Sequence, residues 1–469
     1  MPEEKRTVTD CTCVFCGADC DDLEIDVVGN EIVEVRNACK VGAANYITAQ
    51  GSKRLTTPLW RADKRDEFKP ISWQEAYEKA ADIFIAAKHP LLHGWGETSV
   101  EAIRVGLEIS EVLGGVFDGQ LTNCHGPSVG AIQQVGIPTC TLGEVKNRAD
   151  VIVYWGCNPL HCHPRHMARY APFTRGFFRV DGRSERYVVV VDPRKTDTAK
   201  LADKHLQVNL AEDYELFNAF RAYLNGCDIK GDKDGKISGV LVKDIIEVAD
   251  RMRKAKWGMI FFGLGLTHSM GKLQNVASAI ELTALLNSES KWSIMPLRGH
   301  FNVSGINVVA CWITGYPYGI DFARGYPRFN VGEFTGVEML RDKQVDAMFS
   351  IAVDPGAHWP QKCLERMAEI PLIACDVYKT PTTELANLIL PGTHDGIEAE
   401  ASVYRMDSVP ILMRKVVDPL PGLRPSNAVM LEELLEVILR KKNMHRIGHE
   451  KNSAEIPQSV MHSESPLEK

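Results

Sequence analysis

The sequence lacks a basic excess, since 54 Lys and Arg residues face 61 Asp and Glu residues and the formal net charge is −7. This balance excludes the electrostatic footprint of a nucleic-acid binder. No apolar run is long enough to span a bilayer, and the N-terminal Met-Pro-Glu-Glu-Lys-Arg leads into no hydrophobic signal segment. We therefore expect a cytoplasmic protein with no membrane span and no nucleic-acid partner.

The composition is that of an ordinary globular protein, with 45% hydrophobic and 25% charged residues. A chain of 469 residues is long enough for roughly three domain-sized units, which can be interleaved. The 13 cysteines are an odd number. This count favours a reducing compartment and metal ligation over a disulfide framework.

Four of these cysteines form the most informative pattern, C-x2-C-x3-C-x18-C, at Cys13, Cys16, Cys20 and Cys39. Three thiols so close together cannot easily pair as disulfides, because short loops oppose the required geometry. Three clustered ligands and one distant ligand are typical of a [4Fe-4S] cluster. A structural zinc is the alternative, although zinc sites usually pair two short knuckles. Cys11 falls outside the pattern, and we interpret it as a neighbour of the site.

The middle of the chain has the alternating β-α rhythm of a layered α/β fold. Ser72-Trp73-Gln74-Glu75 is a capping box that predicts a helix over 72–88, and a second helix is predicted around 100–113. Apolar runs predict buried strands that end at glycine-rich or polar turns: 151–155, 187–191, 259–262, 348–353 and 372–375. In open α/β sheets, ligands bind beyond the carboxyl ends of such strands. These turns therefore predict a nucleotide-like ligand across two similar half-domains.

Two further stretches carry reactive side chains. In Asn123-Cys124-His125-Gly126-Pro127-Ser128, the proline predicts that Cys124 and His125 lie in a loop just before a helix, where the helix dipole favours a thiolate. The alternative is a buried cysteine beside a surface histidine. Arg298 follows a strand predicted over 292–297, and it can offer a planar fork to a carboxylate or, alternatively, make an internal salt bridge.

Three histidines, His161, His163 and His166, lie near Cys157 and Cys162. Their spacing matches no standard zinc finger. Their role stays open at this level. A last amphipathic helix is predicted over 430–439, followed by a polar and mobile tail.

Together these stretches resemble the molybdopterin oxidoreductase family, which includes formate dehydrogenases and nitrate reductases. The resemblance implies an N-terminal [4Fe-4S] domain (1–60), two related, interleaved, Rossmann-like α/β half-domains (61–442) that bind pterin guanine dinucleotides, and a tail (443–469). The sequence departs from the family in one respect, because most relatives carry a further C-terminal β-barrel domain that we expect to be absent here. Within the family, the Asn-Cys-His-Gly-Pro-Ser wording resembles the formate-handling branch, in particular the catalytic B subunits of formylmethanofuran dehydrogenases.

The resemblance assigns roles residue by residue. It implies that Cys124 ligates tungsten or molybdenum held by two pterin guanine dinucleotides, with a sulfido ligand, and that Lys40 lies between cluster and pterin. Gly263 and Gly265 are expected where the second half-domain approaches its own dinucleotide. The remaining cofactor-binding residues that it implies are Gly156, Asn158, Pro159, Asp192, Arg194, Thr196 and Asp354.

The reaction implied by the resemblance is reversible reduction of CO2 to formate, the first step of methanogenesis from CO2. Arg298 would hold the carboxylate, and His125 would relay or position a proton. The partners implied are a small β-barrel subunit that covers the pterins, an amidohydrolase-like subunit that condenses formate with methanofuran, and polyferredoxin or other iron–sulfur electron donors. Two alternatives are the catalytic subunit of a formate dehydrogenase and a non-redox scaffold. The four cysteines and Cys124 argue against a scaffold, which has no need of them.

Overall fold

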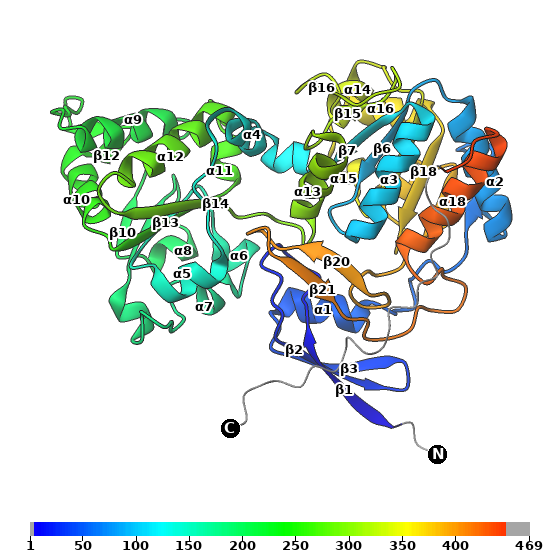
Figure 1. Ribbon diagram of the computed structural model, residues 1–469, viewed down its shortest axis with the longest axis horizontal. Helices are drawn as coiled ribbons and strands as arrows, with labels where there is room; N and C mark the ends of the chain where they lie inside the picture. The colour runs from blue at the N-terminus through cyan, green and yellow to red at the C-terminus, as the bar shows by residue number, and fades with distance from the viewer. Residues whose placement is uncertain (1–3, 447–469) are drawn as a thin grey trace.

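The structure is a computed structural model that describes residues 4–446 (Figure 1). Most of the tail predicted over 443–469 lies outside the described residues. No helix within 4–446 combines the length and the apolar character needed to cross a membrane.

The N-terminal unit is a three-stranded antiparallel sheet followed by one helix. Its strands are β1 (Lys5–Cys11), β2 (Leu23–Val28) and β3 (Glu31–Arg36), in the order β1-β2-β3, and α1 (Lys40–Thr48) follows. The connection between β1 and β2 carries Cys13, Cys16 and Cys20, and Cys39 caps the N-terminus of α1.

A five-stranded parallel sheet forms one half of the main body, on the left in Figure 1. Its order is β10-β9-β8-β13-β14, with the strands β8 (Val151–Trp155), β9 (Tyr187–Val191), β10 (Lys204–Leu206), β13 (Trp257–Phe262) and β14 (Lys291–Pro296). One face packs against α9 (Asp213–Leu224), α10 (Val242–Arg253) and α12 (Lys272–Leu286). The other face packs against α5 (Leu142–Arg148), α7 (His166–Arg169) and the N-terminal unit. The predicted strands at 151–155, 187–191 and 259–262 are confirmed.

A nine-stranded sheet forms the other half, in the order β16-β15-β7-β6-β17-β18-β19-β4-β5. Its parallel centre consists of β7 (Val116–Gly119), β6 (Pro90–Gly94), β17 (Ala347–Ile351), β18 (Leu372–Asp376) and β19 (Leu388–Pro391). Short antiparallel strands close its edges: β4 (Leu59–Trp60), β5 (Lys69–Pro70), β15 (Ile320–Asp321) and β16 (Arg328–Phe329). The strands predicted at 348–353 and 372–375 are therefore β17 and β18.

Helices cover both faces of the nine-stranded sheet. One face packs against α2 (Trp73–Ala86), α3 (Val100–Leu113), α13 (Val303–Thr314) and α18 (Asn427–Lys441), and the other against α14 (Gly336–Arg341) and α16 (Gln361–Glu369). The predicted capping box at Ser72 and Glu75 is confirmed, because each side chain bonds the backbone N–H of the other residue. Short helices follow the strand ends: α6 (Pro159–Cys162), α8 (Asp197–Lys200), α11 (Leu264–Thr267), α15 (Pro355–His358) and α17 (Pro381–Glu384).

The chain enters the five-stranded half through α4 (Gln120–Val135), which directly follows β7 and crosses between the halves (Figure 1). The loop predicted before a helix start at Pro127 is wrong, because Cys124, His125 and Pro127 all lie inside α4. Proline frees the carbonyl four residues before it. Here that carbonyl belongs to Asn123, and it accepts a hydrogen bond from His268 Nε2 at 2.9 Å. A long-range partner therefore satisfies the group that the proline leaves open.

The N-terminal unit packs against the five-stranded half and against a hairpin formed by β20 (Ala401–Tyr404) and β21 (Pro410–Met413). Ion pairs lie at the same boundary, where the Arg165 guanidinium donates to both oxygens of Asp22 at 2.6 and 2.7 Å. The cysteine loop also abuts the Arg298 segment, because a Cβ added at Gly17 would lie 2.7 Å from the Arg298 carbonyl oxygen. The packing therefore places the cysteine-rich loop directly against the centre of the molecule.

Candidate active site

The first cavity lies at the carboxyl ends of β8, β9 and β13 and has a volume of about 860 Å³. Five residues that the sequence analysis singled out line it: Gly156, Asn158, Asp192, Arg194 and Gly265. The prediction that these turns lie together at one edge of a sheet is therefore confirmed, and their cofactor-binding role stays a prediction. The sequence analysis assigned Gly263 and Gly265 to the other half-domain, and that was wrong, since both follow β13 in the same sheet as β8 and β9.

Two glycines form the floor of this cavity by close backbone contact. Gly156 has a φ of +59°, a backbone conformation that residues other than glycine rarely adopt. The Gly265 N–H donates a hydrogen bond to the Gly156 carbonyl at 2.9 Å. A Cβ on Gly265 would lie 2.5 Å from Gly156 Cα, and one on Gly156 would lie 2.9 Å from Gly265 Cα. Only glycine fits either position, so a ligand can approach the backbone itself.

The turn after β9 presents further polar groups. Asp192 accepts a hydrogen bond from Arg194 N–H at 2.8 Å, and the Thr196 hydroxyl caps the start of α8. Pro159 occupies the first turn of α6, and the Asn158 side-chain oxygen accepts from the Thr198 hydroxyl at 2.5 Å. The Arg194 side chain is exposed at the cavity. The backbone of this turn is therefore held by its own side chains, while Arg194 remains available to an anionic ligand.

A second cavity of about 750 Å³ adjoins the first, with Gly156, Asn158 and Arg194 in both linings. Cys124 and His125 line it from α4, and Gly263, Leu297 and Gly299 line it from the five-stranded half. The structure thus brings Cys124 next to the segment that carries Arg298.

Arg298 is 6% exposed and makes no ion pair with any residue of 4–446. One terminal nitrogen donates to Asn307 Oδ1 at 2.7 Å, and Nε has no hydrogen-bond partner among the described residues. The alternative of an internal salt bridge is therefore wrong. Burial lowers the pKa of Arg298 to about 10, and Cys124 opposes that shift. A buried cation without a carboxylate is costly, so an anionic ligand bound beside Arg298 would stabilise it.

Burial also raises the pKa of the Cys124 thiol, to about 11, although the Arg298 charge acts in the opposite direction. Cys124 lies inside α4 and is largely buried, so its surroundings in the protein do not by themselves favour the thiolate that the sequence predicted. A bound metal ion deprotonates a coordinating thiol outright.

His125 is 1% exposed, so the alternative of a surface histidine is wrong. Its Nε2 faces the Leu297 carbonyl at 3.3 Å and therefore carries the proton, and its Nδ1 faces the Ser128 hydroxyl at 3.1 Å. Burial lowers the pKa of His125 to about 3, so the ring is neutral at pH 7. A relay of protons through this ring requires one of these bonds to break, whereas a positioning role does not.

Two residues orient Arg298: Asn307, which sequence reasoning missed, and His163, which it singled out without a role. Asn307 lies on α13 and holds the guanidinium, and no sequence signal marked it. His163 Nε2 donates to the Arg298 carbonyl at 2.7 Å, while its Nδ1 contacts Cys162 Sγ at 3.0 Å. His161 instead pairs with Asp197. The histidine group is thus divided among separate partners, and no set of three metal-binding side chains is found within residues 4–446.

A third cavity, of about 420 Å³, lies at the carboxyl ends of β17 and β18. Its lining includes Asp354, whose carboxylate accepts from the Thr382 N–H and hydroxyl at 2.9 and 2.6 Å. Val41 and Asn45 of α1 also line it, and the exposed Lys40 directly precedes Val41. Each of the two sheets therefore presents a cavity at the carboxyl ends of its parallel strands. Helix α1 contributes to the lining of the third cavity, on the nine-stranded sheet.

Comparison with known proteins agrees with this geometry. The family described as "Molybdopterin oxidoreductase" matches residues 54–437. The chain belongs to this family. It is 48% identical to the B subunit of tungsten-containing formylmethanofuran dehydrogenase 2 from Methanocaldococcus jannaschii, over 93% of this chain and 98% of that protein. The protein of the same description from Methanococcus maripaludis is 43% identical, over 92% and 97%.

A solved structure agrees at the level of the fold. A chain of the formyltransferase/hydrolase complex of Methylorubrum extorquens, solved with methylofuran, superposes with a TM-score of 0.63 at 18% identity. The match covers 82% of this chain and 99% of that chain.

The cavities fit the pterin cofactor of the molybdopterin oxidoreductase family. Adjoining cavities with a glycine floor and an exposed arginine suit an extended anionic ligand, and the uncompensated Arg298 charge lies beside the one thiol that faces the second cavity from α4. Tungsten or molybdenum held by pterin dithiolenes would take Cys124 as a further soft ligand.

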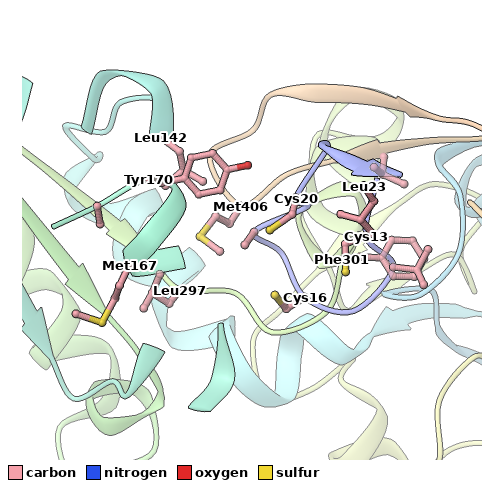
Figure 2. Close-up of a cluster of buried hydrophobic side chains, with 14 of the residues drawn as sticks. Cys13, Cys16, Cys20, Leu23, Leu142, Met167, Tyr170, Leu297, Phe301 and Met406 are labelled. Atoms are coloured by element: carbon pink, nitrogen blue, oxygen red, sulfur yellow. The ribbon is translucent and has the colours of Figure 1, made fainter. Parts of the chain in front are cut away.

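The four cysteines of the N-terminal unit also fit an iron–sulfur cluster. Cys13, Cys16 and Cys20 lie on one buried loop beside Phe301 and Met406 (Figure 2), and none of the 13 cysteines is in a disulfide. A Cβ added at Gly42 would lie 2.7 Å from Cys13 Sγ and 3.6 Å from Cys39 Sγ, so glycine leaves room between these two thiols.

Within residues 4–446 these thiols do not form a group of three or more ligands placed to hold one metal ion. A cubane spreads its four thiolates more widely than one ion does. Cys11 turns its thiol to the Val8 carbonyl instead, at 3.5 Å. The geometry sets it apart from the other four.

Proposed function

We propose that this chain is the catalytic subunit that reduces CO2 to formate in a formylmethanofuran dehydrogenase. The observation that carries the proposal is Arg298, a buried guanidinium beside Cys124 with no carboxylate partner within residues 4–446. The same assignment is supported by similarity to the B subunits of two formylmethanofuran dehydrogenases. The similarity extends over nearly the whole length of both of those proteins and of this chain.

In this proposal Arg298 binds the oxygens of CO2 and formate. A guanidinium presents a planar fork that matches a carboxylate, and in a site shielded from water its charge stabilises the negative charge that develops on the oxygens. Asn307 orients one arm of the fork, and His163 anchors the backbone of the same residue. Arg298 is thereby held before the substrate arrives.

The cofactor we propose is tungsten or molybdenum held by two pterin guanine dinucleotides, with a sulfido ligand, and it would supply the two-electron chemistry. Cys124 would ligate the metal. Gly156, Asn158, Pro159, Asp192, Arg194, Thr196, Gly263 and Gly265 would hold one dinucleotide at the edge of the five-stranded sheet, and Asp354 would hold the other at the edge of the nine-stranded sheet. His125 would keep Leu297 and hence Arg298 in place.

We further propose a [4Fe-4S] cluster at Cys13, Cys16, Cys20 and Cys39, with Lys40 on the side of the second dinucleotide. The cysteine loop touches the Arg298 segment at Gly17, so electrons arriving there have a short path to the reaction centre. The partners in this proposal are iron–sulfur electron donors such as a polyferredoxin, a small β-barrel subunit over the pterins, and an amidohydrolase-like subunit that passes formate to methanofuran.

The test is anoxic purification from the native source, followed by metal analysis and identification of the associated chains. The purified complex is then assayed for two products of CO2 reduction, formylmethanofuran and free formate. We expect tungsten or molybdenum, about four irons per chain, and formylmethanofuran formed from CO2. Release of free formate without use of methanofuran would instead identify a formate dehydrogenase. Absence of tungsten, molybdenum and iron from active complex would refute the proposal.

A further inference from the structure

Exposed apolar side chains gather on one loop that the function described above does not use. The loop joins α7 to β9 and lies at the lower edge of the five-stranded half in Figure 1, near α5 and α7. Phe177 is 79% exposed, Val180 62%, Phe178 50% and Phe173 40%. A soluble surface rarely gathers large apolar groups in this way unless another molecule covers them.

The loop is held in place by its own hydrogen bonds. Phe177 N–H donates to Asn147 Oδ1 at 2.8 Å, and Phe178 N–H donates to the Asn147 carbonyl at 3.1 Å. A Cβ on Gly176 would lie 2.1 Å from the Lys146 carbonyl oxygen, so the loop backbone lies directly on α5. The two phenylalanine rings meet edge to face, with centroids 4.9 Å apart. The aromatic side chains are therefore presented outward by a fixed backbone.

Cations lie on the α5 side of these rings. Lys146, Arg148 and Arg175 are exposed and make no ion pair within residues 4–446, and Arg148 lies over the Phe178 ring at 4.8 Å. By contrast, Arg179 and Arg183 pair with Asp150 and Asp203. Lys146 and Arg148 thus make the α5 side of the loop positive, while Asp181 and Glu185, which make no ion pair in the described part of the chain, follow the loop toward β9.

We propose that this aromatic loop, residues 173–180 with Lys146 and Arg148, is a docking surface for another protein subunit that presents an apolar pocket rimmed by Asp and Glu. Buried aromatic anchors within a polar rim are the usual composition of a protein interface, and opposite charges on the rims select the partner. The three cations around the loop that have no ion pair in the described part of the chain are few for binding to an anionic bilayer. The inference rests on the proposed function only in that the occupant is a subunit of the same complex.

The first test cross-links the native complex with a zero-length carbodiimide, which joins an amine to a carboxylate in contact. We expect Lys146 to be joined to an Asp or Glu of a different subunit, and amides of 173–180 to exchange more slowly in the complex than in the isolated chain. A Lys146 cross-link only within this chain or to a second copy of it, with unchanged exchange, would overturn the proposal. Neither readout depends on turnover, so a failure here is distinct from failure of the proposed function.

The second test uses the variants Phe177→Ser and Phe178→Ser in the complex. Both side chains are at least half exposed, so we expect the melting temperature of the isolated chain to stay the same while the subunit identified by cross-linking co-purifies at least about tenfold less. Tyr326→Ser, at a 54% exposed residue of the other half, is the matched control and should retain that subunit. Equal co-purification of all three variants would refute the proposal, as would binding of the chain to vesicles of phosphatidylcholine and phosphatidylglycerol that requires Phe177. A variant that does not fold leaves the cross-link in the unaltered complex as the deciding measurement.

Discussion

Replacing Arg298 by lysine tests the reaction centre most directly. The guanidinium is 6% exposed, one arm is held by Asn307 at 2.7 Å, and no carboxylate within residues 4–446 neutralises it. Lysine keeps the charge but loses the fork, so it cannot hold Asn307 and both substrate oxygens at once. Loss of one such preorganised donor costs about 3 kcal/mol of transition-state stabilisation. At about 1.4 kcal/mol for each factor of ten, we expect kcat/KM to fall about 150-fold or more.

The assay is formate oxidation and CO2 reduction by the anoxically purified complex, with metal, pterin and iron content measured on the same samples. Arg324→Lys, at an exposed arginine of the nine-stranded half, is the control and should retain full activity. Asn307→Ala keeps the fork but releases one arm, so we expect a smaller loss, on the order of tenfold. Near-normal turnover by a fully metallated Arg298→Lys enzyme would refute the reasoning and place the site elsewhere.

Three other contacts can be tested by substitution. Cys20→Ser should lose most of the bound iron, while Cys11→Ser should keep it, because the Cys11 thiol bonds the Val8 carbonyl; about one zinc and no iron in the unaltered protein would contradict this. Gly156→Ala should deplete bound pterin at least about tenfold, because the added Cβ would lie 2.9 Å from Gly265 Cα and residue 156 has a φ of +59°. A normal pterin content would show that the backbone at Gly156 and Gly265 can shift to accept the Cβ. Arg54→Met should speed thermal inactivation steeply, because Glu398 is 0% exposed and pairs with Arg54 at 2.6 Å. Without Arg54, the buried charge of Glu398 is uncompensated, which costs about 3–5 kcal/mol of stability. The double variant Arg54→Met with Glu398→Leu should recover part of that loss, and an unchanged inactivation rate in the single variant would show that the pair does not stabilise the fold.

Local sequence rules predicted much of the fold because they depend on near neighbours. The capping box at Ser72 and Glu75 closes within one turn of helix, and the continuous apolar runs of β8, β9 and β13 are buried on both faces of a parallel sheet. The same rules failed at Pro127, where a proline inside a helix is tolerated only because His268, 145 residues beyond Asn123, bonds the carbonyl that it frees.

The site divides in the same way. The sequence by itself determined the kinds of group present, four clustered cysteines, a Cys-His pair, glycine turns after strands and an arginine after a strand, because each chemistry needs those residue types. Only the tertiary structure decided which groups meet. Sheet order put Gly265 beside Gly156, and packing brought Asn307 and His163 to Arg298 while leaving it without a carboxylate from residues 4–446. Those outcomes depend on contacts between residues far apart in the chain, which no local pattern encodes.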